Sequence, residues 1–378
     1  MTRYAPDSRQ SAPTEPGSTR GAVRPAGRRR WRSAPGIACC LRTVGRCLAA
    51  LLVPIVLFVG AAPGSGGPQA AAGPAGESRI VGIAPDPDGV LDVQVYSAAM
   101  DTVLAVKVLR ARDTAAAAPA LYLLNGAAGG HGASSWHQKT DIRELFAGEQ
   151  VNVVIPLGGS GSYFTDWQHD DPVLGRQQWT TFLTQELPPL IDEAFNGTGV
   201  NAVAGISMAA TSVFQLALAA PGRYVALGSY SGCVRTSDPM GRMMVRSVVG
   251  RWGGDATNMW GPWPSPAWTA NDPYLHAEEL RGITLYVSTG TGLPGPLETL
   301  QGSGIGGDIG KLVDQAVVGG LLEAVTNHCA HTLRDRLNEL GIPAVFDLRP
   351  NGTHSWGYWE HDLHRSWPLF RDALARGQ

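Results

Sequence analysis

Apolar residues recur with two spacings along residues 80–378. In 104–111 they alternate with polar residues, which is typical of a half-exposed β-strand. The segments 120–126 and 151–159 are almost continuously apolar and end in glycine, as buried parallel strands do. Further strands are predicted over 200–206, 224–232, 283–290 and 344–352, and helices over 179–195 and 321–341. Strands that alternate with helices predict an α/β fold whose mostly parallel sheet has helices on both faces.

The segment 201–220 changes its periodicity in the middle. Alternating apolar residues predict a strand, and the Ala- and Leu-rich second half predicts a helix. Ser207 lies between them in the sequence Gly-Ile-Ser-Met-Ala, which resembles a nucleophile elbow except that alanine takes the place of the last glycine. A serine at this position could instead cap the first turn of the helix. From this stretch alone, both interpretations stay open.

A nucleophilic serine needs a base, and in an α/β-hydrolase fold this base is a histidine after the last strand. His354 follows the last predicted strand directly, and it is our candidate base. His361 and His364 are alternatives, but they lie in the predicted following helix, where a solvated histidine is common.

The third member of such a triad is an acid that orients the histidine. It is expected between the last two strands, where four carboxylates qualify: Glu298, Asp308, Asp314 and Glu323. Glu323 has apolar neighbours at the start of the predicted helix, which makes a simple surface role less convincing, but spacing alone leaves the choice open.

Two backbone N–H groups are expected to stabilise the oxyanion of an acyl-transfer reaction. One belongs to Met208, the residue after the candidate nucleophile, and the other to a loop after an early strand, close to Ala127. The segment 233–280 is rich in Trp, Pro and Gly, and we expect it to form a cap over the carboxyl edge of the sheet.

Charge and composition divide the chain into three parts. The first fifty residues contain ten arginines against two acidic residues, and the apolar run 48–62 follows. This predicts a basic leader with a signal or anchor segment over 1–62, and hence an exported protein. Residues 63–79 form a predicted flexible linker, and residues 80–378 a catalytic domain. Because this domain is acidic, nucleic acid is an unexpected partner.

Few cysteines lie outside the leader. Cys233 and Cys329 are the two in the predicted exported part, and they could form one disulfide. No group of His and Cys residues has the spacing of a metal site, so we expect neither a metal nor a cofactor.

Several longer motifs resemble the mycolyltransferases of the antigen 85 family. These motifs are LYLLNG, SYFTDW, WTTFLTQELP, GISMAA, NMWGPWPSPAW, LLEAVTN and NGTHSWGYW, and they are spread over nearly the whole domain. The resemblance implies an α/β-hydrolase fold and transfer of a mycolyl group between trehalose esters or to arabinogalactan. It also implies Ser207 as nucleophile, Glu323 as acid and His354 as base, with Met208 and Ala127 in the oxyanion hole.

The sequence departs from the family in the loop that contacts the sugar. An Asp-Gly-Leu-Arg sequence is replaced here by Asn125-Gly126-Ala127-Ala128, so we expect Asn125 to contact the acceptor. Trp356, together with three tryptophans of the cap segment, is expected near the same pocket. The predicted partners are therefore a glycolipid and a sugar acceptor at the membrane or cell-wall surface, with the protein acting as a monomer. A secreted carboxylesterase and a catalytically silent adhesin are the alternatives.

Overall fold

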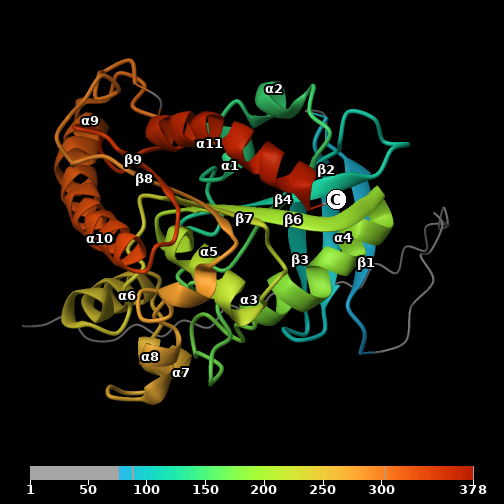
Figure 1. Ribbon diagram of the computed structural model, residues 1–378, viewed down its shortest axis with the longest axis horizontal. Helices are drawn as coiled ribbons and strands as arrows, with labels where there is room; N and C mark the ends of the chain where they lie inside the picture. The colour runs from blue at the N-terminus through green and yellow to red at the C-terminus, as the bar shows by residue number, and fades with distance from the viewer. Residues whose placement is uncertain (1–75, 87–88, 303, 378) are drawn as a thin grey trace, which may run out of the picture. The chain divides into compact units, whose positions relative to one another are not determined.

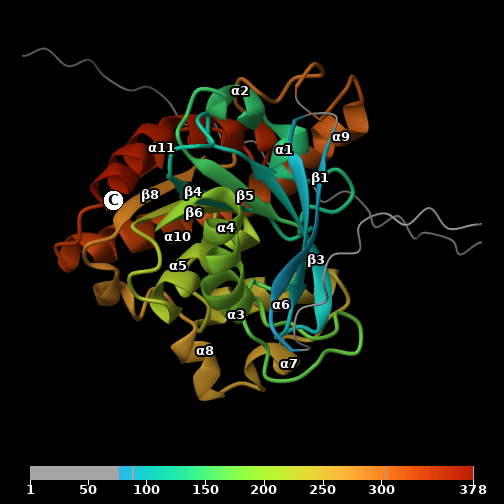
Figure 2. The same ribbon diagram turned by 90° about the vertical axis from the view of Figure 1, so that its right-hand side faces the viewer.

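The computed structural model describes residues 76–377 except 87–88 and 303. A nine-stranded mixed sheet forms the centre of this part of the chain (Figures 1 and 2). Its order is β1-β2-β3-β5-β4-β6-β7-β8-β9. The strands are β1 (Arg79–Pro85), β2 (Leu91–Ser97), β3 (Thr102–Leu109), β4 (Ala118–Leu124), β5 (Asn152–Pro156), β6 (Gly197–Ile206), β7 (Ala226–Tyr230), β8 (Thr284–Thr289) and β9 (Val345–Leu348). The predicted leader and most of the predicted linker lie outside the described residues.

The sheet is antiparallel at one edge and parallel elsewhere. The pairs β1–β2, β2–β3 and β3–β5 are antiparallel. The remaining pairs, from β5 through β4, β6, β7 and β8 to β9, are all parallel. Parallel strands are usually buried on both faces, and β4, β5 and β7 are buried along their whole length. The predicted α/β fold with a mostly parallel sheet is therefore confirmed.

Helices cover both faces of this sheet. The alternation of side chains along β4 divides the core: Tyr122 and Leu124 join one apolar cluster, and Leu121 and Leu123 join the other. The second cluster contains residues of α1 (Trp136–Lys139), α2 (Ile142–Phe146) and α11 (Trp356–Arg376). The first contains residues of α3 (Trp179–Thr181), η1 (Phe182–Glu186), α4 (Leu187–Phe195), α5 (Met208–Ala219) and α10 (Gly320–Glu339).

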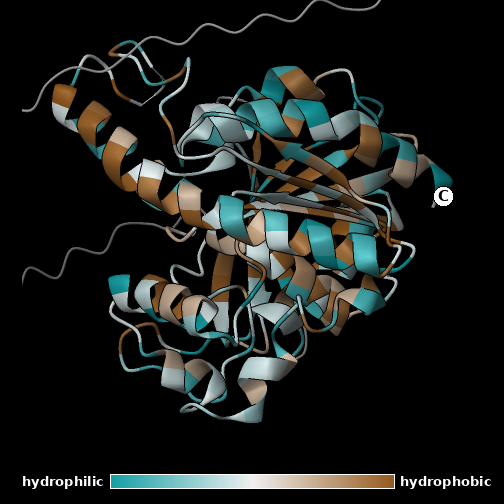
Figure 3. Ribbon diagram, turned by 60° about the vertical axis from the view of Figure 1, so that its left-hand side comes forward, coloured by the Kyte–Doolittle hydropathy of each residue, from teal (hydrophilic) through white to brown (hydrophobic). Residues whose placement is uncertain are grey.

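The predicted cap segment 233–280 is partly helical. It contains α6 (Pro239–Arg251), α7 (Ala256–Trp260), α8 (Pro266–Ala270) and η2 (Ala277–Leu280). Before α10 the chain also forms α9 (Ile309–Asp314) and η3 (Gln315–Gly319). Apolar residues concentrate in the sheet and on the helix faces that pack against it (Figure 3). Among the described residues, no helix is both long and apolar enough to cross a membrane.

Candidate active site

Ser207 occupies a sharp turn between β6 and α5. Its backbone has φ 55° and ψ −119°, a conformation that is strained for a residue with a side chain, and its N–H donates to Tyr230 O at 2.9 Å. Position 205, two residues before Ser207, requires glycine, because a Cβ on Gly205 would lie 2.7 Å from the Ala209 carbonyl oxygen. The Ser207 side chain makes no capping hydrogen bond to α5, so the alternative of a helix cap is wrong.

The hydroxyl of Ser207 contacts His354 instead. Nε2 of His354 lies 2.8 Å from Ser207 Oγ, and Nδ1 lies 2.9 Å from Glu323 Oε2. The loop after β9 therefore brings His354 between β6–α5 and α10. The two alternative histidines are elsewhere: His361 is on the exposed side of α11, and His364 contacts Asp141 at 2.8 Å.

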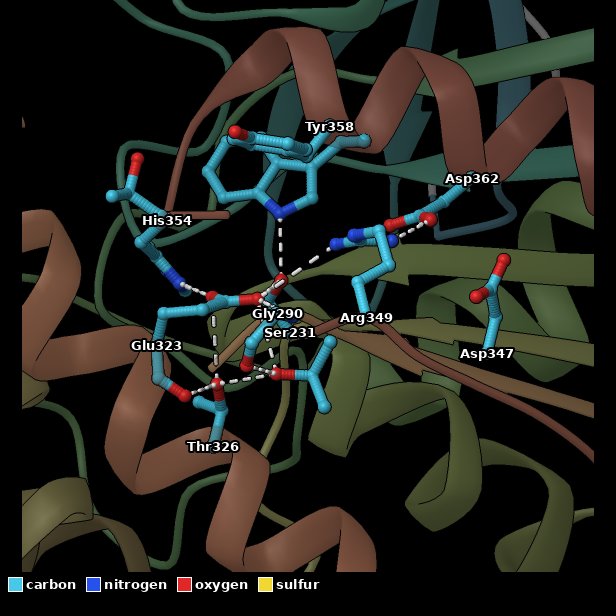
Figure 4. A network of polar contacts seen from close by, with 12 residues as sticks. Ser231, Gly290, Glu323, Thr326, Asp347, Arg349, His354, Tyr358 and Asp362 are labelled. Carbon is cyan, nitrogen blue, oxygen red and sulfur yellow. Dashed lines mark hydrogen bonds and ion pairs between the residues drawn. The ribbon is translucent and has the colours of Figure 1, made fainter. Parts of the chain in front are cut away.

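Glu323 is fully buried and its carboxylate is surrounded by donors (Figure 4). Its Oε1 accepts hydrogen bonds from Ser231 Oγ at 2.8 Å, Thr289 Oγ1 at 3.0 Å and Gly290 N at 2.6 Å. Burying a carboxylate is costly unless such donors replace water. With one oxygen held by three donors, the other oxygen points at His354.

The other three carboxylates considered from sequence are engaged differently. Glu298 accepts hydrogen bonds from Thr353, Tyr358, Gln315 and Gly295. Asp308 caps α9 by accepting from Gly310 N and Lys311 N, and Asp314 is exposed. Of the four, the structure brings only Glu323 into contact with His354.

A cavity of about 350 Å³ opens beside Ser207 and His354. Met208 and Ala127 also line it, and neither of their N–H groups donates a hydrogen bond within the described part of the chain. The rest of the wall comes mainly from α6, η3 and α10, with Met244, Val245, Val248, Val318 and Leu322. The cavity can therefore hold an apolar group whose carbonyl lies at Ser207.

A second cavity of about 370 Å³ also reaches His354. It is more polar, and its lining includes Lys139, Lys311, Gln315 and Trp356. Trp356 is half-buried at the start of α11, and its ring packs edge-on against Trp136 and Trp359. Two spaces of different character thus meet at the same histidine.

Apolar side chains continue outward from the first cavity. Val318 and Leu322 line it and are 50% and 43% exposed. Still more exposed are four apolar residues spaced four apart on the same segments: Ile309, Val313, Val317 and Leu321. Since four residues is slightly more than one helical turn, α9, η3 and α10 present a nearly continuous apolar stripe.

The structure contradicts the prediction that Asn125 contacts the acceptor. Its side chain is fully buried: Nδ2 donates to Pro156 O at 3.1 Å, and Oδ1 accepts from Trp136 N at 3.1 Å. The side-chain amide of Asn125 thus bonds backbone groups of Pro156 and Trp136. It fixes the loop after β4 that carries Ala127, and it does not face a ligand.

The expected grouping of cap-segment tryptophans at the pocket is also wrong. Trp260 and Trp268 are buried and pack against each other, with ring centroids 5.1 Å apart. Trp263 is exposed and lies under the guanidinium of Arg242. None of the three lines either cavity at His354. Large indole surfaces stabilise this segment by burial, and the cavity wall comes from α6.

A disulfide joins Cys233 to Cys329. Cys233 follows β7 and also lines the first cavity, and Cys329 lies on α10. The bridge ties the helix that carries Glu323 to the sheet edge that carries Ser231.

Several residues of this site were not predicted. Ser231 has φ 57° and donates to Glu323 while accepting from Trp359 Nε1 at 3.0 Å. Its place at the end of a parallel strand was a usable signal. Arg349 lies near Glu323 and had no sequence signal. In the parts of the chain that the structure describes, no three His, Cys, Asp or Glu side chains are grouped to hold a metal ion.

The fold and the site together define an α/β-hydrolase with a serine at the elbow. A family model described as "Putative esterase" matches residues 97–370. Ag85A of Mycobacterium tuberculosis, a diacylglycerol acyltransferase/mycolyltransferase, is 34% identical over 268 residues, which cover 68% of this chain and 74% of Ag85A. Ag85B of Mycobacterium avium is 33% identical over 268 residues, which cover 68% of this chain and 76% of Ag85B.

Two solved structures share the fold. MPT51 of M. tuberculosis superposes with a TM-score of 0.61 at 24% identity, covering 74% of this chain and 96% of MPT51. An S-formylglutathione hydrolase from Agrobacterium tumefaciens gives a TM-score of 0.54 at 15% identity, covering 78% and 99%. The chain belongs to this esterase family and, within it, to the antigen 85 mycolyltransferases. Membership in this family identifies the protein as an enzyme of the esterase and acyltransferase class.

Proposed function

We propose that the protein is an exported serine acyltransferase that works through an acyl-enzyme. Ser207 Oγ attacks the ester carbonyl of the donor while His354 Nε2 takes its proton, and Glu323 stabilises the imidazolium. The N–H groups of Met208 and Ala127 stabilise the oxyanion. His354 then returns the proton to the leaving alcohol, and Ser207 carries the acyl group.

One observation carries this proposal. The hydrogen-bonded series Ser207–His354–Glu323, with distances of 2.8 and 2.9 Å, opens into an apolar cavity. Nucleophile and base are within reach of each other, and the base is oriented by a third group, as serine catalysis requires. The apolar stripe outside the cavity suits a donor with a long hydrocarbon chain.

Transfer to a sugar is the second step of the proposal. Water competes with any acceptor, so the acceptor hydroxyl must be bound beside the ester, where its effective concentration can reach about 10⁵ M or more. The polar cavity at His354 supports such binding, and Trp356 is our candidate acceptor contact. The names of the relatives support a mycolyl-type group, moved from a trehalose ester to trehalose or arabinogalactan.

The cellular setting follows from the sequence. A basic segment followed by an apolar run supports export to the cell envelope. We further propose that the protein acts as a monomer at this surface.

A secreted carboxylesterase is the second candidate, and the esterase family model favours it. Both candidates use the same acyl-enzyme, so only the acceptor separates them. The full chain is incubated with a trehalose monoester, and the products are followed by mass, with Ser207→Ala as the control. A trehalose diester supports the transferase, whereas free acid alone, with or without arabinan, supports the esterase.

A further inference from the structure

A buried ion pair lies directly behind Glu323. The guanidinium of Arg349 contacts the carboxylate of Asp362, and their side chains are 11% and 0% exposed (Figure 4). Nη2 of Arg349 lies 3.9 Å from Glu323 Oε1, and the guanidinium stacks 5.2 Å from the ring centroid of Tyr358. Two carboxylates therefore lie on either side of one buried cation.

Four elements hold this arrangement in place. Arg349 follows β9, and its N–H donates to Thr289 O at 2.9 Å. Thr289 ends β8 and also donates its hydroxyl to Glu323 on α10. Asp362 lies in the middle of α11. Since one residue of β8 fixes both Arg349 and Glu323, the cation keeps a defined distance from the carboxylate.

The charges of this cluster act on His354 through Glu323. A cation near a buried carboxylate favours the ionised form, which Glu323 needs in order to stabilise an imidazolium. The same cation by itself would also oppose the positive charge that develops on His354. The carboxylate of Asp362 offsets this second effect, because it balances the charge of Arg349 from the far side.

We propose that Arg349 is a positioning residue for Glu323, and that Asp362 balances its charge, so that the pair sets the pH range in which His354 acts as a base. The proposal rests on the proposed function of Ser207, His354 and Glu323. Neither Arg349 nor Asp362 lines the cavities at Ser207 and His354, so they act through Glu323.

The surroundings of Asp362 support a role at neutral pH. Burial raises the pKa of Asp362 to about 7, and the nearby Arg349 limits this rise. Asp362 interacts electrostatically with Arg349 after β9, Asp347 on β9, Glu323 on α10, Tyr230 on β7 and Tyr286 on β8. His361 and Arg365 are close to it in sequence on α11. In this set, Arg349 is the cation that contacts Asp362.

A purely structural role is the competing explanation. A buried ion pair that links the β9 loop to α11 would destabilise the protein when one partner is removed. Such a loss lowers the amount of active protein at every pH. A charge effect on the Glu323–His354 pair moves the acid limb of the pH profile, and its direction depends on the sign of the charge removed.

The test measures the rate of Ser207 labelling by a neutral fluorophosphonate probe from pH 5 to 9. This reaction needs the nucleophile and the base but neither the natural donor nor the acceptor. The variants are Arg349→Gln, Asp362→Asn, their combination, and Arg349→Lys. Arg365→Gln is the control, because Arg365 lies on the same helix as Asp362 but is 59% exposed and pairs with Asp347.

Opposite shifts are expected. Arg349→Gln removes a positive charge and moves the acid limb to higher pH by about one unit. Asp362→Asn moves it to lower pH by less, since Asp362 lies on the far side of Arg349 from Glu323. In the double variant the acid limb returns toward its position in the unchanged protein. In Arg349→Lys it stays close to that position, and in the control Arg365→Gln it does not move.

The inference would be overturned if the acid limb did not move in Arg349→Gln and Asp362→Asn, or if it moved in the same direction in both. If Arg349→Gln does not fold, the shift of Asp362→Asn to lower pH decides by itself. Absence of Ser207 labelling in the unchanged protein would overturn the proposed function as well, so the two failures are distinguishable.

Discussion

Thr353, the residue before His354, donates a hydrogen bond of 2.6 Å to Glu298. The same carboxylate accepts from Tyr358 at 2.7 Å and from Gln315 at 3.0 Å. Glu298 therefore connects the His354 loop, α11 and the η3 segment of the cavity wall. Glu298, which qualified from sequence as the acid of the triad, instead holds the loop of His354 in place.

Glu298→Gln is expected to lower the free energy of unfolding by about 1–2 kcal/mol at neutral pH, since hydrogen bonds to a charged acceptor are lost. Burial raises the pKa of Glu298, but donors from Thr353, Gly295, Tyr358 and Gln315 outweigh it and hold the pKa below its ordinary value of 4.5. A lowered pKa gives stability that is complete above the ordinary value and is lost as the pH falls through the folded one.

Denaturant unfolding at several pH values checks this. The difference between the two proteins is constant above about pH 5.5 and shrinks below pH 4.5. Glu193→Gln is the control, because Glu193 is exposed on α4. A difference that grows toward acid pH would contradict the role assigned to Glu298.

Glu323→Gln is expected to lower kcat by roughly 10³-fold while the protein stays folded. Three donors surround Oε1, so the amide oxygen of glutamine takes this place and the NH₂ group turns toward His354 Nδ1. The ring then carries its proton on Nε2 and cannot accept from Ser207.

Glu339→Gln is the matched control, since Glu339 lies on the same helix and is 71% exposed. The measurement is steady-state hydrolysis of a chromogenic ester. Equal kcat values for Glu323→Gln and the unchanged protein would refute this orientation of the base.

Removal of the disulfide is expected to destabilise the protein strongly. Cys233 and Cys329 are 96 residues apart in sequence, for which the chain-entropy model gives about 4–5 kcal/mol. The double variant Cys233→Ala/Cys329→Ala should lose this amount in denaturant unfolding and also lose activity, because α10 carries Glu323. Unchanged stability, or two free thiols in the unchanged protein by peptide mapping, would contradict the expectation.

Met244→Trp tests the use of the apolar cavity. Met244 lines the cavity, whereas its neighbour Met243 on the same helix is 59% exposed and does not. Filling the cavity should lower kcat/KM for long-chain esters at least tenfold and leave acetyl esters nearly unaffected. Met243→Trp should affect neither ester. An equal loss for short and long chains would point to general damage and not to occlusion of an acyl site.

The sequence predicts the parallel half of the fold well and the antiparallel edge poorly. The nearly continuous apolar runs of β4 and β5 identify buried strands directly. Nothing comparable marks β1, where every residue is half-buried or exposed. Helix α6 was missed because Gly241 and Gly250 weaken its pattern, although Asp238 and Pro239 form a usable start signal.

The same division holds within the site. Ser207 and His354 follow from local rules, because a strand-to-helix turn and the loop after the last strand are readable positions. The choice between Glu298 and Glu323 depends on their distance to His354, which only tertiary packing determines. Asn125 was misjudged for the related reason that a polar residue after a strand can serve the backbone as well as a ligand.

The proposed reaction requires that Ser207 passes an acyl group to a sugar. The most direct measurement loads the enzyme with a radiolabelled acyl group from a trehalose monoester, isolates the acyl-enzyme, and follows its decay with and without unlabelled trehalose. We expect label on the peptide that contains Ser207, faster decay with rising trehalose concentration, and recovery of the label in trehalose esters. Decay that is independent of trehalose and arabinan, with all label released as free acid, would contradict the proposed reaction.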